Sequence, residues 1–325
     1  MPPPSTGTAT RQTLGGILLL IVAMWGLSCL DASGKFLMGP DVGVTLWVVC
    51  LIRYGGHMIL SMAAVIPSRG WQALRCTRPW SQAGRGLSML TATMLLFTTL
   101  HYLPLGQAAA INFLAPLIVL ALAPWLLKEP PFLSRWVAAG FGLLGVLVVV
   151  RPGAGLDPTG TLLGLLTACC LTVQYITSRR VAVDDPYTTL MWSGAVGTVI
   201  MTLTLPLYWQ DIPALLGRLS PFQWLVLLCT GVWGSVGHFL QIKAYRLAPA
   251  SLLAPFIYFQ IVSAAGLGWL IWGHFPDAIS WLGIGIICTS GITIGIIEWR
   301  RSGNAAAPQP APAPADPVVR ATPRQ

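Results

Sequence analysis

The segment LHYLPLGQAAAINFLAPLIVLALAPW, residues 100–125, decides the fold of this chain. It places a short polar turn before a long apolar stretch that contains proline. The same layout returns at residues 245–269, YRLAPASLLAPFIYFQIVSAAGLGW, and an offset of 144 positions places Leu103 on Leu247. Because a repeated layout at a fixed spacing indicates internal duplication, we expect two similar halves joined end to end.

The composition assigns the chain to the membrane. Of its 325 residues, 55% are hydrophobic and 9% are charged, whereas soluble domains carry about 25% charged residues. Because so few charged residues do not cover the surface of a protein in water, we expect most of the surface to face a lipid bilayer. The seven cysteines show no metal-ligand spacing and are expected to act as small hydrophobic residues. We therefore expect no metal site and no cofactor.

The apolar runs define the domain organisation. A helix needs about 20 apolar residues to cross a bilayer, and on this measure we expect ten spans. Residues 1–12 and the Ala/Pro-rich residues 302–325 are expected to be disordered, and the two repeats to cover 13–151 and 160–301. The expected spans are 13–34, 44–66, 84–101, 106–127, 134–151, 160–178, 187–207, 221–241, 248–272 and 279–299.

The distribution of Lys and Arg predicts the orientation. Of 19 such residues, 15 fall on one side, among them Arg85 at the start of the third span. Lys35, Arg151 and Arg218 fall on the other side, and Arg53 lies within a span. Since cytoplasmic loops carry the excess of positive charge, both termini are expected in the cytoplasm. The net charge of +9 is thereby explained without a nucleic-acid partner.

Two halves of five spans each must enter the membrane from opposite sides. The predicted fold class is therefore all-α, a polytopic membrane protein of ten transmembrane helices in two inverted five-helix repeats. Many secondary transporters have this construction, with the substrate site near the bilayer midplane between the repeats. A membrane scaffold or receptor that transports nothing is the alternative from another functional class.

Polar side chains inside the spans are candidates for the translocation path, because they are costly in a bilayer. Arg53 lies near the middle of the second span, and His57 follows one helical turn later. Arg53 could bind substrate or a proton, or it could form a structural ion pair. Asp31, near the end of the first span, is its expected partner.

Prolines interrupt the fourth and ninth spans. Pro116 and Pro255 each remove a backbone donor and disturb the helix four residues earlier. Interrupted spans at corresponding places in both halves indicate a transport site. Asn112, Tyr258 and Gln260 supply hydrogen-bonding side chains on these spans.

The later spans add further polar and aromatic candidates. Tyr175 and His238 lie within the sixth and eighth spans, although His238 could be an ordinary core histidine. Three deep tryptophans could stack on a flat substrate: Trp25, Trp192 and Trp233. HExxH, GxSxG and phosphate-binding-loop motifs are absent from the sequence, so an enzyme is not expected.

Four segments resemble the drug/metabolite transporter superfamily with two EamA-type repeats. They are MWGLSCLDASGKFL at 24–37, LIRY at 51–54, LPLGQAAAINFLAPLIVLALAPWLLKEP at 103–130 and SRWVAAGFGLLGVLVVV at 134–150. The first two are similar to a bacterial subgroup that includes riboflavin and S-adenosylmethionine uptake transporters. This resemblance implies an inner-membrane carrier of a small organic metabolite.

Riboflavin is the leading substrate expectation, because deep tryptophans suit a flat aromatic ring. S-adenosylmethionine uptake and export of amino acids or drugs are the alternatives. The expected partners are the small-molecule substrate, the lipid bilayer and a coupling proton or counter-substrate. The sequence leaves the transport direction, the coupling ion and the oligomeric state open.

Overall fold

The computed structural model describes residues 6–126, 133–151, 155–181, 183–210, 212–247, 253 and 256–305. Every regular element in these ranges is a helix, as the sequence predicts. Pro255 and most of the predicted C-terminal tail lie outside the described residues.

The first half contains six helices and a short 3-10 helix. The fourth predicted span is divided into two helices, and residues 6–12, predicted to be disordered, form the start of the first helix. The helices are α1 (Thr6–Met38), α2 (Leu46–Arg69), η1 (Trp71–Leu74), α3 (Pro79–Tyr102), α4 (Leu105–Asn112), α5 (Leu114–Leu126) and α6 (Leu133–Val150).

The second half repeats this order, with one short surface helix, α9, that the sequence did not predict. The final helix continues to Ala305, a few residues into the predicted tail. The helices are α7 (Pro158–Arg180), α8 (Pro186–Thr204), η2 (Leu205–Leu207), α9 (Ile212–Arg218), α10 (Pro221–Leu247), α12 (Phe259–Trp272) and α13 (Ala278–Ala305).

Helix length and composition confirm a multi-pass membrane protein. Five helices among the described residues are long and apolar enough to cross a bilayer, in α1, α2, α7, α8 and α10. Shorter apolar helices cover parts of α4 and α5, α6, α12 and α13. Helix α3 has 24 residues but is not among these apolar helices, and one of its faces lines the internal cavity described below.

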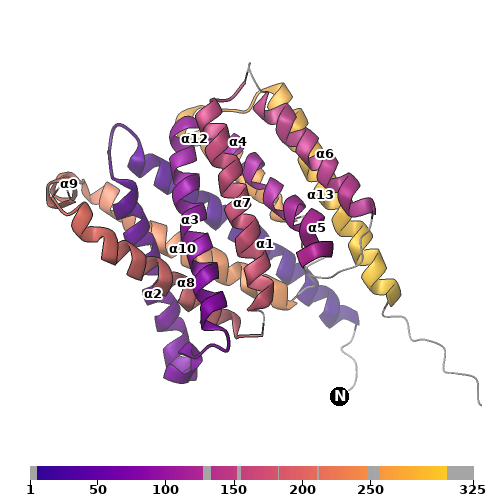
Figure 1. The fold of residues 1–325 in the computed structure, drawn as a ribbon, viewed down its shortest axis with the longest axis horizontal. Coiled ribbons are helices and arrows are strands. Elements are labelled where there is room, and N and C mark those ends of the chain that lie inside the picture. Colours follow the sequence, from indigo (N-terminus) through magenta and orange to yellow (C-terminus); the bar gives the residue numbers. More distant parts are fainter. Residues whose placement is uncertain are drawn as a thin grey trace, which may run out of the picture.

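The two halves pack in reciprocal pairs, as inverted repeats require. The first helix of each half lies against the third helix of the other, which gives the pairs α1·α10 and α7·α3. The helices of the second span of each half pair with each other (α2·α8), and so do those of the fifth span (α6·α13). Figure 1 shows α6 and α13 side by side along one edge of the bundle.

The interrupted helices are symmetric in detail. Helix α4 ends at Asn112 and is followed by Phe113, whose backbone has φ −68° and ψ −4°. Helix α12 begins after Tyr258, whose φ is −63° and ψ is −12°. The two positions correspond within one residue of the 144-residue offset, and their rings pack at a centroid distance of 4.9 Å. The breaks of the two halves therefore meet inside the bundle.

Glycines allow the helix backbones to approach closely. A Cβ placed on Gly56 of α2 would lie 3.0 Å from the Cα of Gly231 in α10. At the α6·α13 contact, a Cβ on Gly145 would lie 2.9 Å from the carbonyl oxygen of Gly283. Small residues at helix contacts are typical of membrane proteins, where association depends on close packing rather than on the hydrophobic effect.

The neighbouring glycines Gly55 and Gly56 provide a matched test of this contact. Gly56→Ala should lower the thermal unfolding temperature of the detergent-purified protein, since overpacking costs about 1–3 kcal/mol. Gly55→Ala should leave it unchanged or raise it slightly, because a Cβ there meets nothing within 4 Å and alanine favours helix. Equal effects of the two substitutions would contradict the α2·α10 packing.

Candidate functional site

A cavity of about 410 Å³ lies between the two halves of the bundle. Its described lining comes from α1, α2, α3, α4, α5, α7, α10 and α12, and neither α6 nor α13 contributes to it. Its volume falls within the range of small-molecule sites, about 300–1,000 Å³. The helix-break residue Pro116 lines it, and so do six of the eight residues predicted for the translocation path: Asp31, Arg53, Asn112, Tyr175, His238 and Gln260.

Arg53 is buried at the wall of this cavity, with 8% of its surface exposed. Its Nη1 donates a hydrogen bond to the hydroxyl of Thr93 on α3. The guanidinium also lies over the rings of Tyr54 and Phe97, at 5.0 and 5.7 Å from their centroids. Cation–π contacts of this kind stabilise a cation away from water. Packing between α2 and α3 therefore fixes the side chain in place.

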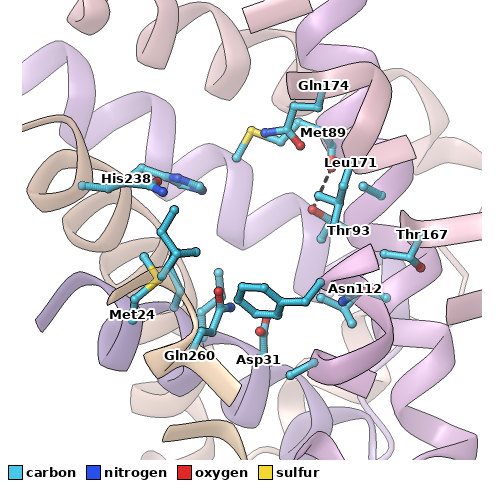
Figure 2. A pocket seen from close by; sticks show the side chains of 18 of the residues that line it. Met24, Asp31, Met89, Thr93, Asn112, Thr167, Leu171, Gln174, His238 and Gln260 are labelled. Atoms are coloured by element: carbon cyan, nitrogen blue, oxygen red, sulfur yellow. Dashed lines mark hydrogen bonds between the residues drawn. The ribbon is translucent and has the colours of Figure 1, made fainter. Parts of the chain in front are cut away.

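Asp31 forms no direct ion pair with Arg53, in contrast to the expected pairing. Its carboxylate is half-buried and interacts with the side chain of Gln260, and the charge of Arg53 acts on it electrostatically. Figure 2 shows Asp31 and Gln260 together at one end of the cavity. The ion pair that the described residues do form, Arg151 with Asp277 at 2.8 Å, joins the ends of α6 and α13.

The two histidines lie together beside the arginine. The ring of His57 packs edge-on against that of His238 at a centroid distance of 5.8 Å. His238 lines the cavity, whereas His57 lies behind it, 3% exposed and with Nε2 unpaired. His57 therefore lies one layer outside the cavity wall, against His238.

Buried polar atoms without partners lie at the cavity wall. The Oδ1 atom of Asn112 and the Oε1 atom of Gln174 have no hydrogen-bond partner, and both side chains line the cavity. Buried polar groups are normally paired with protein or with ordered water. These atoms are therefore available to a polar ligand. Gln174 is 7% exposed and belongs to α7.

The aromatic candidates are divided. Tyr175 lines the cavity, but Tyr258 does not, because its hydroxyl points toward Gly291 of α13. The deep tryptophans also lie outside the lining, and Trp25 and Trp233 are 41% and 36% exposed on the outer surface of the bundle. These tryptophans are therefore not placed to stack on a flat substrate in the cavity.

Arg85 is a charged cavity residue that was not predicted from the sequence. It was counted with the cytoplasmic charges, but it belongs to α3 and lines the cavity. The signal was its position inside the third predicted span, 84–101, one helical turn before the polar Ser88. The cavity thus contains two arginines. Asp31 is the single carboxylate among its described lining residues.

A hydrogen-bonded cluster joins the two halves beyond Arg85. The backbone N–H and the hydroxyl of Thr77 donate to Oδ1 of Asp184, at 2.8 and 2.6 Å. Nε2 of Gln82 donates to Oδ2 of Asp184 at 2.9 Å. Burial raises the pKa of Asp184, but these hydrogen bonds and the charge of Arg78 outweigh it and hold the pKa below its ordinary value.

The geometry suits the binding of a small polar molecule rather than catalysis. The described residues contain no group of three or more His, Cys, Asp or Glu side chains that could hold a metal ion. Charged and amide side chains instead surround an internal space between the two repeats. This is the arrangement of a binding site in a transporter.

Comparison with known proteins agrees with a transporter built from two repeats. The model of the EamA-like transporter family matches residues 14–151 and again residues 158–296. A solved crystal structure aligns with a TM-score of 0.61 at 18% identity, over 90% of this chain and 99% of the other. The two family matches coincide with the two structural halves.

Two kinds of curated relative carry substrate names. The S-adenosylmethionine uptake transporter of Rickettsia prowazekii is 25% identical over 83% of this chain and 88% of its own length. The riboflavin transporter of Vibrio cholerae is 26% identical over 90% of this chain and 96% of its own length. The two identities are too similar to choose between the substrates.

Asp184 offers a test of the cluster beyond the cavity. A carboxylate with a lowered pKa in the fold stabilises it above its unfolded pKa, about 3.9, and loses this effect as the pH falls through the folded pKa. Asp184→Asn should therefore lower the unfolding temperature at pH 7 and have a smaller effect below pH 4. Hydrogen bonds to charged groups contribute about 1.5–3 kcal/mol.

The control is Asp41→Asn, at an exposed loop position with no recorded partner. It should change the unfolding temperature little at either pH. A loss for Asp184→Asn that is equally large at both pH values would show that the carboxylate charge does not matter.

Proposed function

The chain belongs to the EamA-like transporter family, and we propose that it is a secondary transporter working by alternating access. It is a multi-pass transporter of a small metabolite and not an enzyme. In the proposed mechanism the two repeats rock about the central cavity, so that the site opens first to one side of the membrane and then to the other. Reciprocal helix pairs support this, because each half contributes equivalent elements to the site.

The observation that carries the proposal is the cavity between the repeats, lined by Asp31, Arg53 and the amides of Asn112 and Gln174. Ionisable side chains inside a membrane bundle mark substrate or ion pathways. The break between α4 and α5 lies at the same place, and Pro116 there removes the backbone donor to the carbonyl of Asn112. We propose that this carbonyl, which lacks its usual helical donor, binds substrate.

We propose a metabolite with a heterocyclic ring as substrate, with S-adenosylmethionine and riboflavin as the two candidates. The named relatives support both equally. We also propose a bacterial inner-membrane location with both termini in the cytoplasm, supported by the distribution of Lys and Arg. Without Arg85, which belongs to α3, the distribution remains one-sided, with 14 residues against three.

Transport into liposomes tests this function. The purified protein should take up labelled S-adenosylmethionine or riboflavin without ATP, faster than empty liposomes do. Asp31→Asn should cut uptake at least tenfold, because it removes the single carboxylate of the described lining. Asp41→Asn, on an exposed loop, should transport normally.

Two results would count against the proposal. Uptake of neither compound by well-folded protein would remove both candidate substrates. Normal uptake by Asp31→Asn would show that transport does not depend on the carboxylate that lines the cavity.

A further inference from the structure

We propose that the cavity has an anion-binding end, formed by Arg85 and Gln174, that holds a carboxylate or phosphate group of the substrate. This inference rests on the transport function proposed above and specifies the chemical class of its substrate. It depends on the hydrogen-bond geometry of Arg85, on the charge balance of the cavity and on an unpaired amide next to the arginine.

Hydrogen bonds to two uncharged serine hydroxyls hold Arg85 in position. Its Nε donates to the hydroxyl of Ser178 on α7 at 2.8 Å, and its Nη1 donates to the hydroxyl of Ser193 on α8. Each serine in turn donates to a carbonyl of its own helix, Ser178 to Gln174 at 2.6 Å and Ser193 to Thr189 at 2.8 Å. The serine hydrogens are thus used, and the oxygens accept from the arginine. The guanidinium is preorganised but keeps its full charge.

A guanidinium has five N–H donors in a planar fork. Two of the five from Arg85 are used by the serines, and Nη2 has no recorded partner among the described residues. Since Arg85 lines the cavity, a ligand there has access to the remaining donors. Paired N–H groups of arginine match the oxygens of a carboxylate or phosphate.

The charges of the cavity are unbalanced at this end. Neither Arg85 nor Arg53 forms an ion pair with a carboxylate of the described residues. Asp31, the carboxylate of the described lining, lies with Gln260 at the other end of the cavity (Figure 2). Arg85 and Thr93, the residue that binds Arg53, are eight positions apart on α3, a rise of about 12 Å. An anionic ligand group would supply the missing negative charge.

Gln174 provides an independent sign of a ligand beside Arg85. It is 7% exposed, it lines the cavity and its Oε1 has no partner. It lies one helical turn before Ser178, which binds Arg85 directly. Figure 2 shows Gln174 next to Met89, at the end of the cavity away from Asp31. An amide presents either its oxygen or its two N–H donors, so it can bind a polar group held by the arginine.

The alternative role for Arg85 is a structural clamp that only joins α3 to α7 and α8. The two roles differ in what the serines do. In a clamp, removal of both serine hydroxyls has the same effect as removal of the guanidinium. In an anion site, the charge matters and the serines only position it.

Binding to the purified full-length protein separates these roles. The probes are S-adenosylmethionine with its decarboxylated form, flavin mononucleotide with riboflavin, and a panel of carboxylates and phosphates with their uncharged amides and alcohols. Ligand-induced stabilisation against thermal unfolding and titrated affinity are the two readouts. Wild-type protein should prefer the anionic member of at least one pair by roughly 10- to 100-fold, the range for a charge-assisted hydrogen bond.

Three variants then test whether the preference for the anionic ligand depends on the charge of Arg85. Arg85→Gln should abolish it while leaving affinity for the uncharged member within about threefold. Arg85→Lys should keep part of it, because the positive charge remains. The double variant Ser178→Ala/Ser193→Ala should also retain most of it, which a clamp would not allow. Size-exclusion profiles and unfolding temperatures without ligand verify that each variant folds.

Several outcomes would overturn the anion site. These are no stabilisation by any anion of the panel, a preference that survives Arg85→Gln, or equal losses for charged and uncharged members. The proposed function fails in a different way. Arg85-dependent anion binding without uptake into liposomes would leave the anion site standing and remove transport, whereas Arg85-independent uptake of a neutral compound would do the reverse.

Discussion

The positive charges of Arg53 and Arg85 inside the bundle are the constraint on which the rest of the structure depends. A guanidinium at mid-membrane costs about 2.5–3.5 kcal/mol on insertion scales, so the protein must solvate it from within. Thr93 and the rings of Tyr54 and Phe97 do this for Arg53, and two serines do it for Arg85. These partners come from α2, α3, α7 and α8. The charge of Arg53 is thus stabilised by the packing of α2 on α3, and that of Arg85 only when the two halves are packed together.

Duplication explains how this internal space arises. Close glycine contacts such as Gly56 with Gly231 let helices of opposite halves approach along their backbones. The helix breaks at Phe113 and Tyr258 meet in the interior and end the regular backbone hydrogen bonding there. A cavity lined by polar side chains therefore lies at the boundary between the repeats, where relative motion of the halves would change access to it.

The fold could be predicted from the sequence more fully than the site. Span positions follow from apolar length, and Asp31, Arg53 and Asn112 were recognised because polar residues in spans are rare. Arg85 was missed because charge near a predicted span end reads as a loop, and α3 begins at Pro79, five residues before the predicted start. Tyr258 and the deep tryptophans were misjudged because membrane depth does not tell which face of a helix points inward.

A cavity that opens alternately to the two sides of the membrane should be reached by reagents from both sides, and side-specific labelling measures this. Ala109 of α4 lines the cavity, so Ala109→Cys in a cysteine-free background can be treated with a membrane-impermeant thiol reagent in right-side-out and inverted vesicles. The account predicts labelling from both sides, with transported substrate slowing it. Labelling from one side only, unchanged by substrate, would contradict alternating access around this cavity.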